Sequence, residues 1–468
     1  MIPPNKKLFN EEIDIRRWLI AMTWEGALAT VFITMTSGAF LTGLALYLGA
    51  SDFIIGLMAA IPYLMQTFQI PAAFLIDRTG KRKEITVWNS VVARQLWWLI
   101  PPLMFLSGQW RLAALIGIIL VSNLTIMIAT PGWMSWIADL VPDKIRGRYF
   151  GYRSAAVAFS TITATIGGGL LLDHFHAINK ENFGFALIIA IGALFALAAV
   201  ILLNRVPDRT TRRVGLNWGH IIRPLKEPKF RHLMRIFIAW NLAIGVAAPF
   251  FAAHMLTNLK MSFTLISLYS ALGAIVAIIL NRPWGRLIDK FGCKPIATIC
   301  ALGISIIPLI WWIPREGHLG ILWFEAVYSG ALWAGLNLAA FNIPIANSPR
   351  GERTTYLAMF SVLSGLAFFA SSLIGGLLAE NWSHLHWHWG QQIVVNYHLL
   401  FALSSLLRFL AALLFFTFRV PKEPGLPVVL QFMGDSVLKW FSMARDIFPH
   451  LLKSEPKSHR PEKNNGAY

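Results

Sequence analysis

"FLIDRTGKRKEI" (residues 74–85) is a short charged segment that separates two long apolar runs. A similar segment, "RLIDKFGCKPI" (residues 286–296), separates two other apolar runs in the second half of the chain. Each contains a glycine, Gly80 or Gly292, and glycine readily takes the positive φ that ends a helix and begins a tight turn. The duplication predicts two similar halves, each with a helical hairpin at this position.

The composition of the chain indicates that lipid is its solvent. Of the 468 residues, 56% are hydrophobic and only 14% are charged, whereas a soluble domain has about 25% charged residues. Only helices and closed barrels can span a bilayer, and a spanning helix needs about 20 apolar residues. Continuous apolar runs of that length recur here, unlike the alternating pattern of barrel strands. We therefore predict an all-α membrane protein.

The apolar runs predict twelve transmembrane helices. The first run is too long for the apolar core of a signal peptide and lacks a small-residue cleavage site, so we expect no cleavable signal. The expected spans are residues 18–48, 53–76, 85–106, 112–138, 149–172, 184–203, 233–256, 263–288, 295–314, 319–345, 356–378 and 397–418.

The distribution of basic residues predicts how the chain is oriented in the membrane. If both termini lie in the cytoplasm, 35 of the 41 Lys and Arg residues fall on the cytoplasmic side, in agreement with the positive-inside rule. Anionic lipid headgroups attract basic segments of this kind, so the net charge of +18 does not require a nucleic-acid partner. We expect a multi-pass protein of the bacterial inner membrane.

This orientation divides the chain into five segments. The apolar residues of 428–453 have near-helical spacing, which indicates an interfacial helix, with a loosely ordered tail as an open alternative. The expected segments are a cytoplasmic N-terminal segment (1–17), a first six-helix bundle (18–203), a basic cytoplasmic linker (204–232), a second six-helix bundle (233–418) and a cytoplasmic tail (419–468).

Further landmarks recur in the same order in both halves. "PDKIRGRY" (142–149) is similar to "PRGERTTY" (349–356), and "GGLL" occurs at 168–171 and again at 375–378. Trp24 in the first span has a counterpart in Trp240 of the seventh. An ordered repeat of this kind predicts two pseudo-symmetric six-helix bundles related by an axis along the membrane normal.

With these motifs in place, the chain resembles the major facilitator superfamily of transporters over residues 12–420. The loop signature between helices 2 and 3 of that family has an Asp, a basic residue, a Gly and two more basic residues at fixed spacing. The resemblance implies alternating access, with these motifs acting as gating elements that stabilise the outward-open state. The positions that match, in this loop, in its second copy and in the helix 4–5 loop, are Asp77, Arg78, Gly80, Arg82, Asp139, Arg146, Gly147, Asp289, Gly292 and Arg353.

The sequence departs from the family pattern at a few positions, and it leaves a simpler interpretation open. Ala73 replaces a Gly, Cys293 replaces a basic residue, Asp139 replaces the more usual Glu, and Ala346 stands where an acid is expected. The basic residues of the loops could also serve only the positive-inside rule, but an acid among them, such as Asp77, does not follow from topology.

Among the ionisable residues inside the expected spans, four stand out, because a charge is costly there and indicates a function. They are Glu25, Arg94, Glu325 and Arg408. The resemblance implies that Glu25 and Glu325 face a central cavity, where either could couple transport to protons or contact substrate. It also implies that Arg94 and Arg408 pair within their own halves. For Glu25 a structural ion pair with Arg94 is an alternative.

Polar and aromatic residues on helices 1, 4, 7 and 10 are further candidates for a cavity lining. Each Trp could instead be an interface anchor, and each Asn could instead join two helices. Helix 5 contains "TATIGGGLLL" without a proline, which disfavours a proton/drug antiporter of this family and leaves symport and uniport open. The cavity candidates are Asn123, Trp136, Trp240, Asn241, Trp333 and Asn337.

Together these features predict a secondary active transporter that moves a small organic solute by alternating access, with or without proton coupling. A non-transporting sensor or lipid-handling protein of the same fold is the alternative. We expect no enzyme activity, because the sequence has no nucleotide-binding glycine loop, no plausible metal cluster and no nucleophile–base pair at informative spacing. We accordingly expect no cofactor and no metal, and a monomer whose partners are its solute, the bilayer and, in the coupled case, protons.

Overall fold

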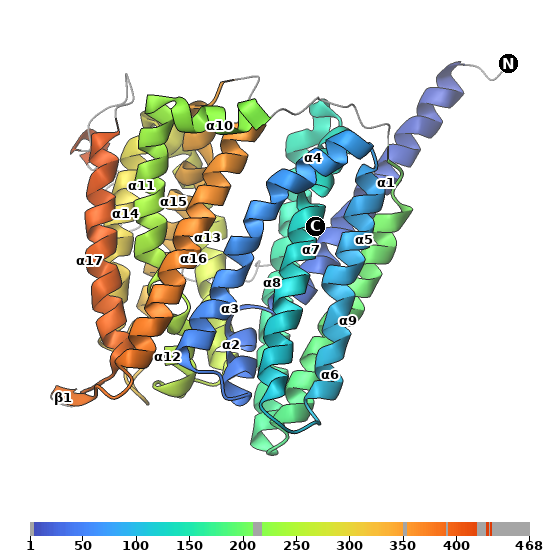
Figure 1. Ribbon diagram of the computed structural model, residues 1–468. Coiled ribbons are helices and arrows are strands. Elements are labelled where there is room, and N and C mark those ends of the chain that lie inside the picture. Colours follow the sequence, from blue (N-terminus) through green and yellow to red (C-terminus); the bar gives the residue numbers. More distant parts are fainter. Residues whose placement is uncertain are drawn as a thin grey trace, which may run out of the picture.

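The computed structural model describes residues 4–208, 218–349, 353–389, 392–418, 427–429 and 431–432. These residues form two helical bundles that lie side by side (Figure 1). The bundles converge at the end that carries β1 and diverge at the end that carries α10 (Figure 1). We call the second of these the linker end and the opposite one the far end.

The first bundle contains six spans. The first and second spans are each broken by a short turn. The third span continues through a 3-10 turn at Leu96–Leu99 into a segment with two prolines. The spans are α1 (Pro4–Met35) with α2 (Gly38–Tyr47); α3 (Asp52–Met65) with α4 (Gln69–Thr79); α5 (Arg82–Gln95) with α6 (Ile100–Leu103); α7 (Trp110–Leu140); α8 (Arg146–Ala177); and α9 (Glu181–Arg205).

The second bundle repeats this arrangement after a short helix at the linker end, α10 (Trp218–Lys226). Its spans are α11 (Pro228–Gly245) with α12 (Phe250–Thr257); α13 (Phe263–Phe291); α14 (Cys293–Ile310); α15 (Gly320–Ala346); α16 (Arg353–Asn381); and α17 (Asn396–Thr417). The predicted twelve-helix membrane fold is confirmed. Ten of the spans are long and apolar enough to cross a bilayer on their own; the two others, α5–α6 and α15, are shorter or less apolar.

The structure differs from the expectation in a few details. Helix α1 begins at Pro4, well before the expected start of the first span. The loop before α17 contains a small antiparallel hairpin of β1 (Trp387–Trp389) and β2 (Gln392–Val394), with His388 opposite Ile393. The expected interfacial helix at 428–453 lies outside the described residues, except for 428–429 and 431–432.

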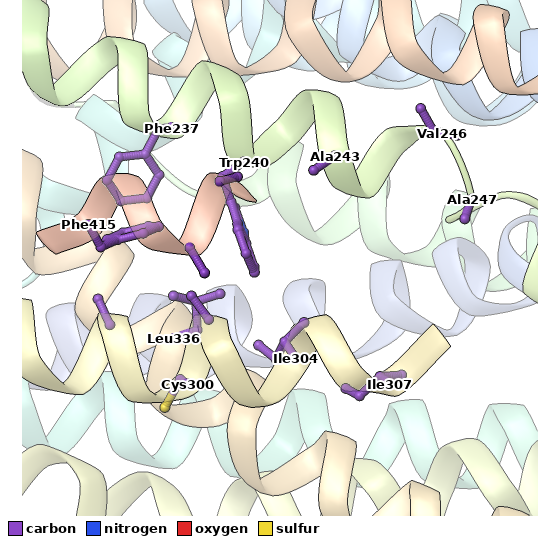
Figure 2. Packing of buried hydrophobic residues seen from close by; sticks show 14 of the residues in the cluster. Phe237, Trp240, Ala243, Val246, Ala247, Cys300, Ile304, Ile307, Leu336 and Phe415 are labelled. Atoms are coloured by element: carbon purple, nitrogen blue, oxygen red, sulfur yellow. The ribbon is translucent and has the colours of Figure 1, made fainter. Parts of the chain in front are cut away.

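Each bundle has an apolar core, and Ile55 of α3 also packs into the core cluster of the second bundle. In the second bundle, Phe237 and Trp240 of α11 pack edge-to-face on Phe415 of α17, with ring centroids 5.6 and 6.0 Å apart (Figure 2). Ile304 of α14 and Leu336 of α15 fill the same cluster. The first bundle has one buried cluster near each end. Because most of each core lies within one bundle, the bundles can move as bodies while most of their interiors stay packed.

Candidate functional site

A carboxylate of each bundle caps a helix of the other at the far end. Asp173 of α8 accepts hydrogen bonds from the backbone N–H groups of Phe263 and Thr264, both 2.8 Å, at the start of α13. Glu380 of α16 accepts hydrogen bonds from the Phe53 N–H at 3.0 Å and from the Ser51 hydroxyl at 2.8 Å, at the start of α3. Helix N-termini attract negative charge, and hydrogen bonds to a carboxylate are stronger than neutral ones.

The two caps are related by the internal repeat. Asp173 and Glu380 each lie four residues after the second glycine of a "GGLL" motif, Gly169 or Gly376. A Cβ at Gly169 would lie 2.8 Å from the carbonyl oxygen of Phe263, and a Cβ at Gly376 would lie 3.0 Å from Phe53 Cα. The glycines therefore let α8 and α16 approach the capped helices closely, and the repeated motif marks both crossings between the bundles.

Additional contacts strengthen the far-end closure. Asp52 of α3 accepts hydrogen bonds from the Tyr397 hydroxyl at 2.5 Å and the Asn396 amide at 2.9 Å, both on α17. Tyr63 of α3 stacks on Phe368 of α16 with ring centroids 3.9 Å apart. All of these contacts join the two bundles, so the far end is held shut by polar and aromatic groups together.

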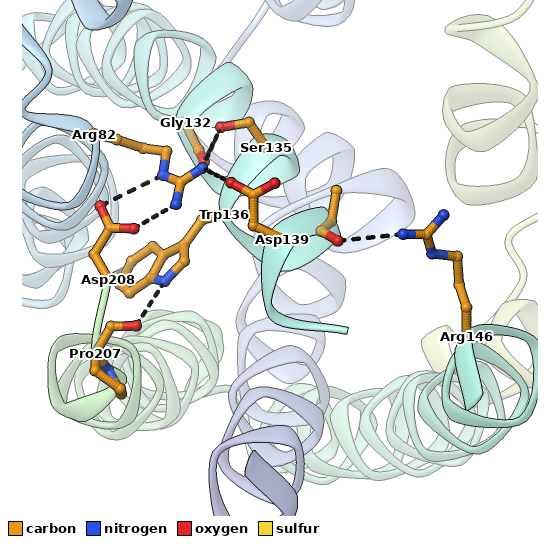
Figure 3. A network of polar contacts seen from close by, with 9 residues as sticks. Arg82, Gly132, Ser135, Trp136, Asp139, Arg146, Pro207 and Asp208 are labelled. Atoms are coloured by element: carbon orange, nitrogen blue, oxygen red, sulfur yellow. Dashed lines mark hydrogen bonds and ion pairs between the residues drawn. The ribbon is translucent and has the colours of Figure 1, made fainter. Parts of the chain in front are cut away.

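At the linker end, the gating-motif residue Arg82 is bound within the first bundle. Its guanidinium donates to Asp139 of α7 at 2.5 Å, to the Ser135 hydroxyl at 3.1 Å, and through two nitrogens to Asp208, just after α9 (Figure 3). The Arg82 side chain is 1% exposed. These contacts join α5, α7 and Asp208, just after α9, so they brace the first bundle.

The other gating-motif positions lie at or near helix ends in both bundles. Arg146 donates to the Ala138 carbonyl at 3.4 Å (Figure 3). Gly80 and Gly292 have φ values of +70° and +89°, so the positive φ predicted at both turns is confirmed. Arg78, Gly147, Asp289 and Arg353 are exposed at or near helix ends, and Asp77 is half-buried near the end of α4.

Glu25 lies inside the first bundle in an ion-pair cluster. Its carboxylate is 3.0 Å from Arg94 Nη2 of α5 and 3.8 Å from Arg153 Nη2 of α8. The Glu25 side chain is only 2% exposed, so the expectation that it faces an open cavity is wrong. Two guanidinium groups cover it, and the pair with Arg94 left open by the sequence is present.

Glu325 lies inside the second bundle, close to a pocket. It is buried on α15 and accepts a hydrogen bond from the Tyr269 hydroxyl of α13, so the expectation that it faces the cavity directly is also wrong. Arg408 of α17 is buried too and interacts electrostatically with Glu325. Because Tyr269 lines a pocket of about 360 Å³ between α13 and α15, it links the carboxylate to that pocket.

The cavity candidates from the sequence divide into three groups. Trp333 and Asn337 line the pocket beside Tyr269. The amides of Asn123 and Asn241 donate to carbonyl groups one turn earlier in their own helices, both at 2.8 Å. The third group is the two tryptophans Trp136 and Trp240, which are buried.

Trp136 and Trp240 are buried, 1% and 3% exposed, and their assignment to a cavity is wrong. The Trp136 indole N–H donates to the Pro207 carbonyl at 3.1 Å (Figure 3), and Trp240 packs in the core of the second bundle. The physical reason is the same for both: a large ring stabilises more by filling the interior of its own bundle than by lining open space.

Several residues of the site were not found from the sequence. Asp173 and Glu380 follow the repeated "GGLL" motif, which was recognised only as a landmark. Arg153 was counted among the basic residues of the cytoplasmic side. Asp208 is an acid in an otherwise basic segment, and that contrast was the signal that could have identified it.

Comparison with known proteins agrees with this geometry. The family model described as Major Facilitator Superfamily matches residues 26–247 and again residues 233–454, one match for each half. An uncharacterized MFS-type transporter of Methanocaldococcus jannaschii is 23% identical over 75% of this chain and 89% of its own length. Multidrug resistance protein 2 of Bacillus subtilis is 20% identical with the same two coverages. A crystal structure of a mutant of the nucleoside transporter NupG is similar with a TM-score of 0.69, at 11% identity, over 86% of this chain and all of that one.

Proposed function

The chain belongs to the major facilitator superfamily of integral membrane transporters, and from this premise we propose that it moves a small organic solute by alternating access. The observation that carries the proposal is the asymmetry of the contacts between the bundles. Reciprocal carboxylate caps close the far end, while the Arg82 contacts at the linker end brace the first bundle.

The state of the molecule follows if the linker end faces the cytoplasm, as the basic residues predict. The far end then faces outward and is shut, so the structure represents an inward-facing conformation. In the outward-facing state the caps of α3 and α13 have to separate, and the linker ends of the two bundles have to meet. The resemblance implies that the gating motifs, including Arg82 and Asp139, make contacts between the bundles in that second state.

A reversible cross-link across the far end tests alternating access. The Ser51 hydroxyl contacts the Glu380 carboxylate at 2.8 Å, so a short bis-methanethiosulfonate reagent should bridge Ser51→Cys and Glu380→Cys in a background in which Cys293 and Cys300 are replaced by alanine. We expect cross-linking to abolish solute flux in proteoliposomes and reduction to restore it. Each single cysteine variant is the control, because it loses the same polar contact without a cross-link. Undiminished flux in the cross-linked protein would contradict alternating access.

The same preparation separates a transporter from the alternative, a non-transporting sensor of this fold. A thermal-shift screen of metabolites and drugs identifies solutes that bind, and counterflow then measures their exchange across the membrane. Binding with no movement of solute in either direction would support the sensor. The substrates and coupling of the relatives are not assigned to this chain, because sequence identities of 11–23% are too low to transfer them.

Proton coupling is assigned to Glu325 rather than to Glu25. Glu25 is paired with Arg94 and Arg153 inside the first bundle, apart from the pocket in the second bundle. Glu325 is connected through Tyr269 to the pocket lined by Trp333 and Asn337. A change between the inward-facing and outward-facing states could alter the access of the Glu325 carboxylate to water in that pocket.

A charge-neutralising variant tests this assignment. We expect Glu325→Gln to abolish accumulation driven by a pH gradient but to retain counterflow exchange, which needs no net proton movement. Glu316→Gln is the control, since Glu316 is an exposed acid paired with Lys260 at the far end. If Glu325→Gln still accumulates solute against a gradient, the assignment fails.

A further inference from the structure

The Glu25 cluster contains more positive than negative charge. Two guanidinium groups, Arg94 of α5 and Arg153 of α8, face one carboxylate, Glu25 of α1. Tyr149 of α8, which is neutral, also interacts with Glu25 and Arg153. One positive charge in the cluster therefore has no counter-charge among these groups. Burying such a charge is costly unless an anion accompanies it.

The cluster also has hydrogen-bond donors that no described residue satisfies. Arg94 Nη1 and Arg153 Nε are buried and have no acceptor in the described part of the chain. The Arg94 side chain is 10% exposed and that of Arg153 is 17% exposed. Buried donors are almost always paired in folded proteins, so this pair points to an acceptor that comes from outside the chain.

The position of Arg153 is fixed by its neighbours. Its guanidinium lies over the ring of Trp133 at 4.9 Å. On α1, Gly26 leaves room for it, because a Cβ there would lie only 2.3 Å from Arg153 Nη2. The guanidinium is thus held between the Trp133 ring and the α1 backbone at Gly26. A preorganised guanidinium loses little freedom on binding, and its planar fork matches carboxylate and phosphate oxygens.

The cluster is close to the end at which the bundles diverge. Arg153 is seven residues from Arg146, where α8 begins, which places it about 10 Å along the helix from the linker end. The Arg94 and Arg153 side chains keep 10% and 17% of their surface exposed, so a solute that approaches from the linker end can meet both of them.

We propose that Arg94 and Arg153 bind an anionic group, a carboxylate or a phosphate, of the transported solute. This inference rests on the proposed function and adds the substrate class: small organic anions. Glu25 is then a positioning residue that holds both guanidinium groups and limits their net attraction for the anion.

Anion binding to the purified full-length protein tests the proposal. Succinate and inorganic phosphate serve as probes, neutral succinamide serves as the control, and ionic strength is held constant in detergent without added phospholipid. We expect succinate or phosphate to raise the melting temperature saturably and succinamide to leave it unchanged. Arg153→Gln should abolish the rise. Arg148→Gln should retain it, because Arg148 is an exposed cation on the same helix, outside the cluster.

A second variant keeps the test decisive if Arg153→Gln does not fold. Glu25→Gln removes the carboxylate that competes with the anion for the two guanidinium groups, so the affinity for the anion should rise about tenfold. If the cluster only stabilises the fold, the same variant should lose stability with no gain in affinity. Equal stabilisation of the wild type, Arg148→Gln and Arg153→Gln would overturn the proposal. No stabilisation by either anion, or an unchanged affinity in Glu25→Gln, would also overturn it.

Two further measurements distinguish binding of an anionic solute from binding of a lipid headgroup, and this inference from the proposed function. If phosphatidylglycerol stabilises the protein in an Arg153-dependent way and succinate and phosphate do not, the anion is a lipid headgroup and the solute assignment fails. Flux of a neutral solute without any anion binding would overturn this inference alone. Anion binding without flux of any solute would overturn the proposed function and leave the binding site intact.

Discussion

Asp173 and Glu380 are the two side chains whose charge holds the far end shut. Asp173→Asn keeps an oxygen acceptor but loses the charge that the α13 N-terminus favours, a loss of about 1 kcal/mol. We expect the population open at the far end to rise about fivefold, since about 1.4 kcal/mol corresponds to tenfold. The measurement is the rate at which an impermeant maleimide labels a cysteine placed at Thr42, which lines a pocket between the bundles.

A matched acid at the same end provides the control for that prediction. Glu181 pairs with His176 of its own bundle at 2.9 Å, so Glu181→Gln should leave the labelling rate unchanged. Equal rates in Asp173→Asn and the wild type would show that the cap does not hold the far end.

Arg82 is the residue on which the linker end of the first bundle depends. Arg82→Gln removes the partner of Asp139, which is 58% exposed, and of Asp208, which is 17% exposed. Because a hydrogen bond to a charged group contributes about 1.5–3 kcal/mol and the Asp139 pair is screened by solvent, we expect a lower melting temperature in detergent. Lys81→Gln next to it should have little effect, because Lys81 and its partner Glu84 are both exposed. A similar melting temperature in both variants would contradict the bracing role of Arg82.

The residue scale is also where sequence reasoning was weakest. It identified Gly80 and Gly292 because the positive φ of a turn is a local requirement. It did not identify the caps, because each depends on a partner far along the chain: Asp173 binds a residue 90 positions away and Glu380 one 327 positions away. Whether Glu25 faces solvent likewise depended on Arg153, which comes from another helix.

At the scale of elements, the crossings of α8 with α13 and of α16 with α3 decide how the bundles meet. Gly169→Ala would place a Cβ 2.5 Å from the Ser267 hydroxyl and 2.8 Å from the Phe263 carbonyl, which forces α8 away from α13. We expect a cost of about 1–3 kcal/mol and faster labelling at a cysteine in position 42, since Asp173 then loses contact with the helix it caps.

The same helix offers a control two residues earlier. Gly167 has no atom within 4 Å of a built Cβ, so Gly167→Ala should be neutral or slightly stabilising through its higher helix propensity. A labelling rate that changes equally in both variants would mean that helix propensity, and not the crossing, controls closure.

The elements themselves were largely predictable. Long apolar runs predict the spans because the bilayer requires helices of about that length, and the repeated motifs predict two similar halves. The breaks within spans, such as the turn between α11 and α12, were not predicted, because a short irregular turn leaves the hydropathy of the run almost unchanged. The hairpin of β1 and β2 was missed for a similar reason: three residues per strand make a weak pattern.

At the scale of the whole molecule, the two bundles meet where α3 packs along α16 and α8 packs along α13. The predicted architecture follows from the internal repeat, since similar sequences fold alike and dock about an axis. The relative tilt of the bundles does not follow from it, because closure depends on tertiary contacts such as the Tyr63–Phe368 stack and the Asp52 contacts with α17. A solute reverses the tilt only if it binds the other state more tightly, and moving the population from 1:99 to 99:1 takes a difference of about 5.5 kcal/mol.

Asp208 determines where the covalent connection between the bundles begins. Arg82 holds this carboxylate against α5 and α7, and the ten peptide steps from Asp208 to Trp218, where α10 begins, form the covalent tether between the bundles. Ten peptide steps reach about 35 Å when fully extended. The separation of the two anchor points cannot exceed that reach, so the tether sets an upper limit on the rocking amplitude. Deleting residues from it should stall turnover once the remaining length falls below the widest opening.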